Sequence, residues 1–198
     1  MKRLFDIIVS GVGLLITLPL SLLIALLIYL DSGGPVIYKA LRAGKSGRNF
    51  LMYKFRTMVL NADKIGGPST SADDPRLTNI GKFLRKYKLD ELPQFVNILK
   101  GDMSFVGPRP EVPFEVLQYE NDTKNAILSV RPGLTDLASI ADLHEEEVLR
   151  GAKDPHQMYK EKIQPQKIAL QLEYIQKKSF WLDIQILIKT FLNVVLHK

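Results

Sequence analysis

Leu89–Pro110, with the sequence LDELPQFVNILKGDMSFVGPRP, combines two adjacent carboxylates with glycines, prolines and an arginine. Proline is tolerated in the first turn of a helix, so Pro93 makes Asp90 the natural N-cap of a helix that ends at Gly101. Asp90 and Glu91 would then lie at the positive end of the helix dipole, where a bound phosphate is also favoured. This segment predicts a helix that begins at a phosphate-handling site.

The predicted position of Asp90 favours an ionised carboxylate at neutral pH, because the helix dipole stabilises the charged form. A carboxylate of this kind can attack phosphorus, as it does in aspartyl-phosphate enzymes. The alternative is that Asp90 only caps the helix and Glu91 only faces water, since capping acids are common. The residues around the pair favour the catalytic hypothesis.

The amino-acid composition of the chain limits the kinds of chemistry that it can carry out. A chain of 198 residues that is 46% hydrophobic allows one domain with a core and one membrane element. It contains no cysteine, which excludes disulfides and thiolate chemistry, and its three histidines are scattered. Any metal would be a hard, oxygen-ligated ion, with Mg²⁺ as the leading candidate. The net charge of +6 suits an anionic membrane, an anionic substrate or nucleic acid without choosing among them.

Residues 1–33 are predicted to form a membrane element. Ile7–Leu30 carries no charge and, as a straight helix, would extend about 36 Å, enough to cross a bilayer. Pro19 lies in the middle of this run, where it removes a helix hydrogen bond and forces a bend or a break. We therefore predict a re-entrant helix-break-helix, and the alternative is a spanning helix with a proline kink.

The charges that flank the apolar run support the re-entrant hypothesis. Basic residues lie on both sides of it, namely Lys2 and Arg3 before the run and Lys39, Arg42, Lys45 and Arg48 after it. Because the positive-inside rule then gives no asymmetry, neither end is driven across the membrane. Both ends are expected on the cytoplasmic side.

Residues 34–198 are predicted to form an α/β-type domain on the cytoplasmic face, mostly helical with a small β-hairpin. Val36–Arg42 and Arg48–Phe55 have strand composition around a turn rich in glycine. Lys54 and Arg56 are two residues apart, so on a strand they would point to the same face and could meet a diphosphate.

Two further helices are predicted to lie near substrate or lipid. Thr78 or Asn79 can cap a basic helix that contains Arg85, a candidate phosphate clamp five residues before Asp90, although most basic helix faces are only solvated. The segment from Ser179 is apolar nearly all round, which suits either an interfacial amphipathic helix or a helix packed in the core. Arg131, in a proline–glycine turn, is another candidate for substrate binding.

The order of these features resembles the monotopic phosphoglycosyl transferases, bacterial sugar transferases that begin glycan assembly on polyprenyl phosphate. The resemblance runs from about Lys2 to Leu192 and suggests the minimal form of the family, without added membrane helices. It rests on the proline-broken apolar segment and four motifs, which are YKFRTM at 53–58, the block 89–110, RPGLT at 131–135 and SFWLDI at 179–184.

The resemblance implies a reaction. Asp90 matches the family nucleophile, which attacks the β-phosphate of a UDP-sugar, releases UMP and leaves a phosphosugar on the carboxylate, and Glu91 completes the dyad. Polyprenyl phosphate then attacks this intermediate. Mg²⁺ in the family is held at the aspartate and the donor diphosphate, where it offsets charge.

The resemblance also implies further site residues. Arg109, in the Pro108–Pro110 turn, Arg85 and Lys54 match positions at or near the phosphate site, and Asp183 matches an acidic residue on the C-terminal helix. Two departures limit the transfer. Leu18 precedes Pro19 where the family often has serine, and 136–139 (DLAS) replaces a common Gly-Trp-Ala-Gln, so base or sugar contacts from that segment are not transferred.

The expected partners are therefore a UDP-sugar, polyprenyl phosphate and membrane lipids, with the protein monotopic on the cytoplasmic face of the bacterial inner membrane. No recognition helix or stacking-aromatic pattern points to nucleic acid. The competing hypothesis is a catalytically silent membrane scaffold for a glycan-assembly complex. The sugar, the polyprenol length, the downstream glycan and a homodimeric state stay open.

Overall fold

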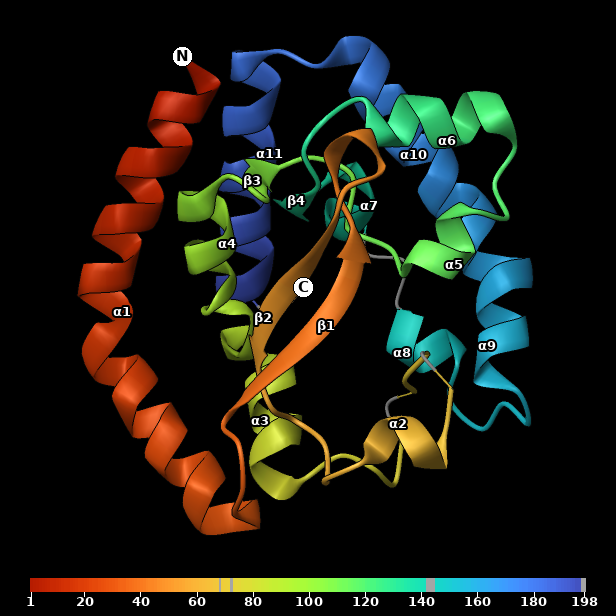
Figure 1. Cartoon of the computed structure of the whole chain (residues 1–198). Helices are drawn as coiled ribbons and strands as arrows, with labels where there is room; N and C mark the ends of the chain where they lie inside the picture. Colours follow the sequence, from red (N-terminus) through yellow and green to blue (C-terminus); the bar gives the residue numbers. More distant parts are fainter. Residues whose placement is uncertain (68, 72, 142–144, 197–198) are drawn as a thin grey trace.

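Helix α1 (Lys2–Ser32) runs along one side of a body built from shorter helices and two small sheets (Figure 1). The computed structural model describes residues 1–67, 69–71, 73–141 and 145–196. After α1 the elements are β1 (Ile37–Ala43), a 3₁₀ turn (Lys45–Gly47), β2 (Asn49–Phe55), α2 (Ala62–Ile65), α3 (Asn79–Lys86), a 3₁₀ turn (Leu89–Glu91), α4 (Gln94–Lys100), β3 (Ser104–Val106), α5 (Pro113–Val116), α6 (Asn121–Leu128), β4 (Gly133–Thr135), α7 (Leu137–Ile140), α8 (Glu145–Val148), α9 (Pro155–Met158), a π-helical turn (Tyr159–Ile163), α10 (Gln164–Lys177) and α11 (Phe180–Leu196). The prediction of a mostly helical fold with a small hairpin is confirmed.

Helix α1 continues through Pro19 without interruption, so the predicted break is wrong. Proline removes one N–H from the hydrogen-bond ladder, and that loss bends a helix rather than ending it when the turns on both sides are held in place. Figure 1 shows α1 curving around the rest of the chain. The re-entrant topology itself stays a prediction.

Both ends of α1 are attached to the body of the protein. Near its start, Asp6 is 2% exposed and accepts a hydrogen bond from the backbone N–H of Phe105 at 3.2 Å. Near its end, Ile24 and Ile28 are buried and belong to the same apolar cluster as Phe55 of the hairpin. The helix is therefore fixed at two points about 30 Å apart along its axis.

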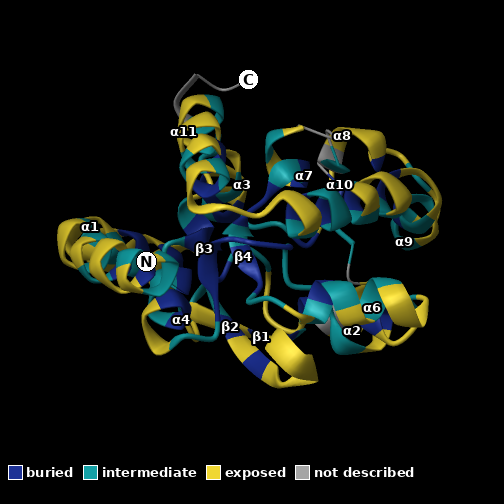
Figure 2. Ribbon diagram, turned by 90° about the horizontal axis from the view of Figure 1, so that it is seen from above, coloured by how far each residue is buried: buried dark blue, intermediate teal, exposed yellow. Residues whose placement is uncertain are grey.

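The outer face of α1 is apolar and exposed. Leu15 and Ile16 are 74% and 73% exposed, and Figure 2 shows α1 at the edge of the molecule with much of its surface uncovered. Among the helices that the structure describes, α1 alone is long and apolar enough to cross a membrane, by length and composition. An exposed apolar face of this extent is typical of a membrane or protein interaction site.

The described residues form two small sheets. Strands β1 and β2 pair antiparallel, with Ile37 opposite Phe55 and Ala43 opposite Asn49, as predicted for the hairpin. Strands β3 and β4 pair parallel, with Val106 opposite Thr135. This second pair was not predicted, because three-residue strands are too short to show an alternating pattern. It joins two turns that are far apart in the sequence.

The main core lies between the hairpin, α4, β3 and the last two helices. Its most buried members are Ile98, Met103 and Ile186. Helix α11 contributes Ile186 to this core, while Trp181 and Phe191 on the same helix are 70% and 67% exposed. One face of the C-terminal helix therefore packs in the core, while another is exposed and apolar, and the predicted contact of that face with lipid stays a prediction.

Candidate active site

Asp90 lies in the 3₁₀ turn Leu89–Glu91, directly after Lys88, whose φ of 55° places it in the left-handed region. Helix α4 begins only at Gln94, so the prediction that Asp90 is its N-cap is wrong. The chain passes Pro93 with hydrogen bonds of the i to i+3 type, since proline has no N–H to extend an α-helical ladder backwards. The predicted end of the helix at Gly101 is confirmed, with φ at 95°.

Glu91 lies between two cations. Lys54 Nζ is 3.0 Å from Glu91 Oε1 and 3.8 Å from Asp90 Oδ2. Arg109 forms an ion pair with the same Glu91 carboxylate, and its Nη1 also donates to the carbonyl of Leu134 at 3.0 Å. Three of the predicted site residues thus meet around Asp90. The carboxylates themselves are 8% and 10% exposed.

The two carboxylates have opposite pKa shifts. Burial alone would raise the pKa of Glu91, but the charges of Arg109 and Lys54 outweigh it and hold that pKa well below its ordinary value. Burial raises the pKa of Asp90, against the lowering effect of Lys54 and Arg85. Burial thus opposes the predicted effect of the helix dipole on Asp90, and Asp90 is the more basic of the two carboxylates.

The position of Lys54 depends on a buried asparagine. Asn97 of α4 is fully buried; its Oδ1 accepts a hydrogen bond from the backbone N–H of Tyr53 at 2.9 Å, and its Nδ2 donates to the carbonyl of Leu51 at 2.8 Å. These bonds fix the edge of β2 against α4. Lys54 follows Tyr53, so its side chain is brought to the turn that carries Asp90. Sequence reasoning missed Asn97, which resembles any polar residue in a helix.

The position of Arg109 depends on the parallel pair β3–β4. Pro108 is fully buried, and its carbonyl accepts a hydrogen bond from the N–H of Gly133 at 2.9 Å. The backbone N–H of Arg109 donates to Asp136 Oδ2 at 3.2 Å. The Pro108–Pro110 turn is therefore held by residues that follow it by more than twenty positions in the sequence.

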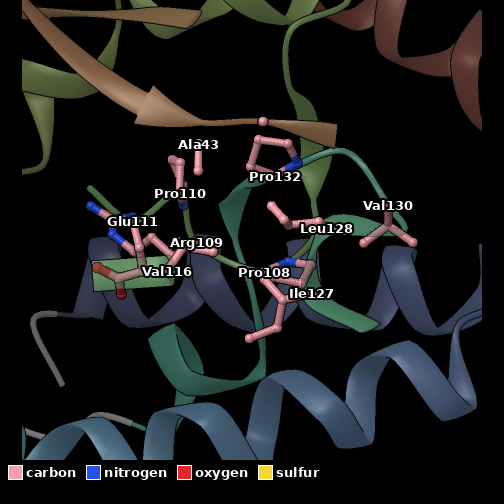
Figure 3. A pocket seen from close by; sticks show the side chains of 11 residues that line it. Ala43, Pro108, Arg109, Pro110, Glu111, Val116, Ile127, Leu128, Val130 and Pro132 are labelled. Atoms are coloured by element: carbon pink, nitrogen blue, oxygen red, sulfur yellow. The ribbon is translucent and has the colours of Figure 1, made fainter. Parts of the chain in front are cut away.

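A small cavity lies behind this turn. It has a volume of about 10 Å³, room for about one water molecule, and its lining includes Pro108, Arg109, Pro110 and Glu111. Figure 3 shows these side chains together with Val116, Ile127 and Val130. The cavity is too small for a nucleotide sugar, so in this conformation it is part of the support of the turn and not a substrate pocket.

Arg85 is placed by α3, whose N-terminus is capped as predicted: Thr78 Oγ1 accepts a hydrogen bond from the N–H of Gly81 at 2.9 Å. The charge of Arg85 lowers the pKa of Asp90, which places the guanidinium within electrostatic reach of the carboxylate. The structure thus agrees with Arg85 as a cation near the site.

Two side chains that were predicted to bind substrate contact other partners in the structure. Arg56 is directed to the end of α1, where its Nη2 donates to Ser32 Oγ at 2.7 Å, because β2 ends at Phe55 and the chain turns there. Arg131 donates from Nε to the carbonyl of Gly101 at 2.9 Å, at the end of α4 distant from Asp90. These contacts engage Arg56 and Arg131 with other partners, and the substrate contacts predicted for the two residues stay predictions.

Asp183 is also separate from the Asp90 turn. Its carboxylate pairs with Lys2 Nζ at 2.6 Å and accepts a hydrogen bond from the hydroxyl of Tyr174 at 2.7 Å. It is 5% exposed and ties α11 to the start of α1 and to α10. Asp183 thus makes a contact between helices in this structure, and its predicted substrate contact stays a prediction.

The carboxylates of Asp90 and Glu91 are the candidate ligands for Mg²⁺ at this turn. The described residues contain no group of three or more histidine, cysteine, aspartate or glutamate side chains that could hold a metal ion. Mg²⁺ is usually held by one or two carboxylates together with substrate phosphates and water, not by an all-protein cage. Asp90 fits that pattern, whereas Glu91 is already paired with two cations.

Comparison with known proteins gives consistent matches. The chain is 36% identical over 201 residues to UDP-N-acetylgalactosamine-undecaprenyl-phosphate N-acetylgalactosaminephosphotransferase of Aeromonas hydrophila, with 98% of this chain and 43% of the relative covered. It is 37% identical over 201 residues to UDP-glucose:undecaprenyl-phosphate glucose-1-phosphate transferase of Escherichia coli, covering 100% and 41%. It is 35% identical over 213 residues to undecaprenyl-phosphate galactose phosphotransferase of Salmonella typhimurium, covering 100% and 41%.

The chain spans about two fifths of the length of these curated relatives, and their names give three different sugars. The matched region includes the Asp90 turn and both elements that carry its cations. A model of the family described as bacterial sugar transferase matches residues 1–197, almost the whole sequence. The chain therefore belongs to the bacterial sugar transferase family.

Proposed function

We propose that this chain transfers a sugar 1-phosphate from a UDP-sugar to polyprenyl phosphate through a covalent intermediate on Asp90, with release of UMP. The observation that carries the proposal is the arrangement around one turn: a buried carboxylate with a raised pKa, next to a second carboxylate that is neutralised by Arg109 and Lys54. The names of the relatives support undecaprenyl phosphate as the acceptor class.

The proposed first step balances without an added proton. A carboxylate oxygen of Asp90 forms a bond to the β-phosphorus of the UDP-sugar, and the bond from that phosphorus to the bridging oxygen breaks. UMP leaves with the bridging oxygen and its electron pair. In the second step an oxygen of polyprenyl phosphate attacks the same phosphorus, the acyl-phosphate bond breaks, and the Asp90 carboxylate is regenerated.

The other residues have separate roles in this proposal. Lys54 and Arg85 supply positive charge beside Asp90, where the transferred phosphoryl group would develop negative charge. Arg109 holds Glu91 in place, and Glu91 in turn holds Lys54 at 3.0 Å. The cations are thus fixed before substrate binds, which is the condition for electrostatic stabilisation of a transition state.

Asp90 is the residue that would hold Mg²⁺ together with the donor diphosphate. When bound, the ion would neutralise charge on the diphosphate and favour the departure of UMP. The Asp90 carboxylate has to be ionised both to bind the ion and to attack phosphorus, and the charges of Lys54 and Arg85 favour that ionised form.

The attachment of α1 supports a monotopic protein on the cytoplasmic face of the bacterial inner membrane. Because Asp6 and Ile28 both contact the same body, the two ends of α1 lie on the same side of any bilayer that the body rests on. The exposed apolar faces of α1 and α11 would meet lipid. In this proposal a lipid phosphate and a soluble nucleotide sugar would both reach Asp90.

UMP release tests the proposal. Purified protein is incubated with Mg²⁺, undecaprenyl phosphate and a panel of UDP-sugars, including UDP-glucose, UDP-galactose and UDP-N-acetylgalactosamine. We expect release with at least one sugar and loss of release in Asp90→Asn, while the exposed control Asp122→Asn retains it. Without acceptor, the intact mass of the wild-type protein should increase by one phosphosugar.

Two outcomes would contradict the proposal in different ways. Robust UMP release by Asp90→Asn would remove Asp90 as nucleophile while leaving the overall reaction. Absence of release with every donor, from folded protein in detergent, would favour the membrane-scaffold hypothesis.

A further inference from the structure

We propose that Asp136 is a positioning residue that holds the Pro108–Pro110 turn so that Arg109 meets Glu91. The inference rests on the proposed function, because it assigns a role in that same site. Asp136 belongs to 136–139, the segment where this chain departs from the common family pattern. Its contacts reach from the end of β4 to Arg109.

Both oxygens of the Asp136 carboxylate accept hydrogen bonds, two each. Its Oδ1 accepts hydrogen bonds from the backbone N–H and the hydroxyl of Ser139, both at 2.8 Å. Its Oδ2 accepts from the backbone N–H of Arg109 and from Nε2 of Gln171, both at 3.2 Å. Asp136 and Gln171 are 0% and 1% exposed. One oxygen therefore caps α7, and the other binds the turn that carries Arg109.

The bond to Arg109 is decisive for the turn because of its two prolines. Proline has no backbone N–H, so Arg109 has the only main-chain donor in Pro108–Pro110. Asp136 accepts that donor. Loss of this acceptor would remove the hydrogen bond made by the only backbone N–H group of the turn. The N–H of Arg109 would then be unsatisfied in a partly buried place.

Strand pairing brings Asp136 to this position. The N–H of Gly107 donates to the carbonyl of Thr135 at 3.1 Å, and the N–H of Gly133 donates to the carbonyl of Pro108 at 2.9 Å. A Cβ on Gly133 would lie 2.2 Å from the backbone nitrogen of Gly107, so the two strands approach this closely only because both residues are glycines. The residues that follow the strands are then neighbours.

The same strand also holds the guanidinium of Arg109. Nη1 donates to the carbonyl of Leu134 at 3.0 Å, while the group as a whole pairs with Glu91. Leu134 and Asp136 therefore fix Arg109 at both ends, one at the side chain and one at the main chain. The charge of Glu91, and to a smaller extent that of Asp136, raises the pKa of Arg109. Asp136 thus acts on Glu91 only through Arg109.

A substitution to asparagine separates positioning from helix capping. Asparagine caps a helix as well as aspartate does, so Asp136→Asn should have little effect if Asp136 only caps α7. As a positioning residue, however, it must accept from donors at both oxygens, and the asparagine amide has only one accepting oxygen. We expect kcat for UMP release to fall about 10- to 100-fold in Asp136→Asn, with the KM for the UDP-sugar within about threefold of wild type.

A double-mutant cycle tests whether the effect runs through Arg109. We expect Asp136→Asn to add no further loss of kcat to Arg109→Ala, because the group that it positions is already absent. The matched control is Asp154→Asn, a capping carboxylate of α9 that accepts from the N–H groups of His156 and Gln157 at 3.0 Å. This control should retain kcat within about twofold. Multiplicative losses in the double variant, or wild-type kcat in Asp136→Asn, would overturn the proposal.

The variant Gln171→Met and a thermal-unfolding measurement test the proposal if Asp136→Asn does not fold or if the wild-type protein releases no UMP. If Asp136→Asn does not fold, Gln171→Met removes the other donor to Oδ2, and its smaller loss of kcat should likewise vanish in the Arg109→Ala background. If wild-type protein releases no UMP, the proposed function fails, and the same cycle is measured by thermal unfolding. Non-additive shifts in Tm would then support the link between Asp136 and Arg109, and additive shifts would overturn it.

Discussion

The ammonium group of Lys54 lies 3.0 Å from Oε1 of Glu91, so its closer carboxylate partner is the second acid of the pair and not Asp90. Arg109 pairs with the same oxygen of Glu91. The charges therefore alternate in the order Arg109, Glu91, Lys54 and Asp90. In the proposed mechanism this order lets Lys54 act on Asp90, the proposed nucleophile, while Glu91 holds Lys54 in place.

Replacement of Lys54 by methionine tests the electrostatic part of this arrangement. The charge of Lys54 lowers the pKa of Asp90 against the effect of burial, so its loss should raise that pKa. Because Asp90 must be ionised to act as the proposed nucleophile, the acid limb of the pH profile of kcat/KM should move to higher pH. At neutral pH the rate should fall by about 100-fold or more.

Lys124 of helix α6, which is half-buried and donates to Asn121, provides the control, since Lys124→Met removes the same charge away from the site. Its pH profile should match that of wild type. An acid limb in Lys54→Met that stays in place or moves to lower pH would show that Lys54 does not act on the ionisation of Asp90.

Replacement of Glu91 by glutamine should reduce stability in a pH-dependent way. The folded protein holds the pKa of Glu91 well below its ordinary value, since Arg109 and Lys54 outweigh burial. A depressed pKa stabilises the fold above the unfolded value of about 4.3, and that contribution is lost as pH falls through the folded value. At pH 7 we expect Glu91→Gln to lower the free energy of unfolding by about 2 kcal/mol, less than for a fully buried pair because both cations retain access to solvent.

Urea unfolding in detergent at several pH values checks this expectation. The difference between wild type and Glu91→Gln should be constant between about pH 7 and pH 5 and should narrow below about pH 4. A difference that widens as the pH falls would contradict the assignment of Glu91 as the ionised partner of Arg109.

The local features of the fold could be predicted from the sequence because they depend on neighbours in the chain. The hairpin follows from the composition of residues 37–55, the cap of α3 from Thr78, and the end of α4 from Gly101. The meeting of Lys54 and Arg109 around Asp90 was expected from the resemblance to a family. In each case the deciding residues lie within a few positions of one another, or they belong to the ordered motifs on which the family resemblance rests.

The remaining features depend on tertiary contacts that no local pattern reveals. Arg56, Arg131 and Asp183 are charged residues in the expected motifs, yet each finds its partner on another element: Ser32, Gly101 and Lys2. The parallel pair β3–β4 is equally hidden, because it forms between two three-residue segments. The predicted helix break at Pro19 is absent, because packing at both ends of α1 outweighs one missing hydrogen bond.

Gly133 offers a test of the strand pairing. A Cβ at this position would lie 2.2 Å from the nitrogen and 2.3 Å from the oxygen of Gly107, and backbone atoms cannot move aside as a flexible side chain can. Gly133→Ala should therefore separate β3 from β4, lower the free energy of unfolding by about 3 kcal/mol or more, and remove UMP release.

The control for this substitution is Gly11→Ala. No heavy atom lies within 4 Å of a Cβ at Gly11, which is inside α1. Alanine there should leave activity intact and should stabilise the helix by about 0.5–1 kcal/mol. Equal behaviour of the two variants would show that the close approach of Gly107 and Gly133 is not required.

Replacement of Asp183 by asparagine distinguishes a substrate contact from a contact between helices. If Asp183 bound substrate, Asp183→Asn would raise the KM for a substrate. The pairing with Lys2 Nζ at 2.6 Å and the hydrogen bond from Tyr174 at 2.7 Å instead predict unchanged KM values and a weaker attachment of α1. A thermal-unfolding cycle of Asp183→Asn and Lys2→Met should give a coupling of about 1 kcal/mol, modest because the Lys2 side chain is 39% exposed while that of Asp183 is 7% exposed. A raised KM with no coupling would return Asp183 to the substrate site and would require the start of α1 to move when substrate binds.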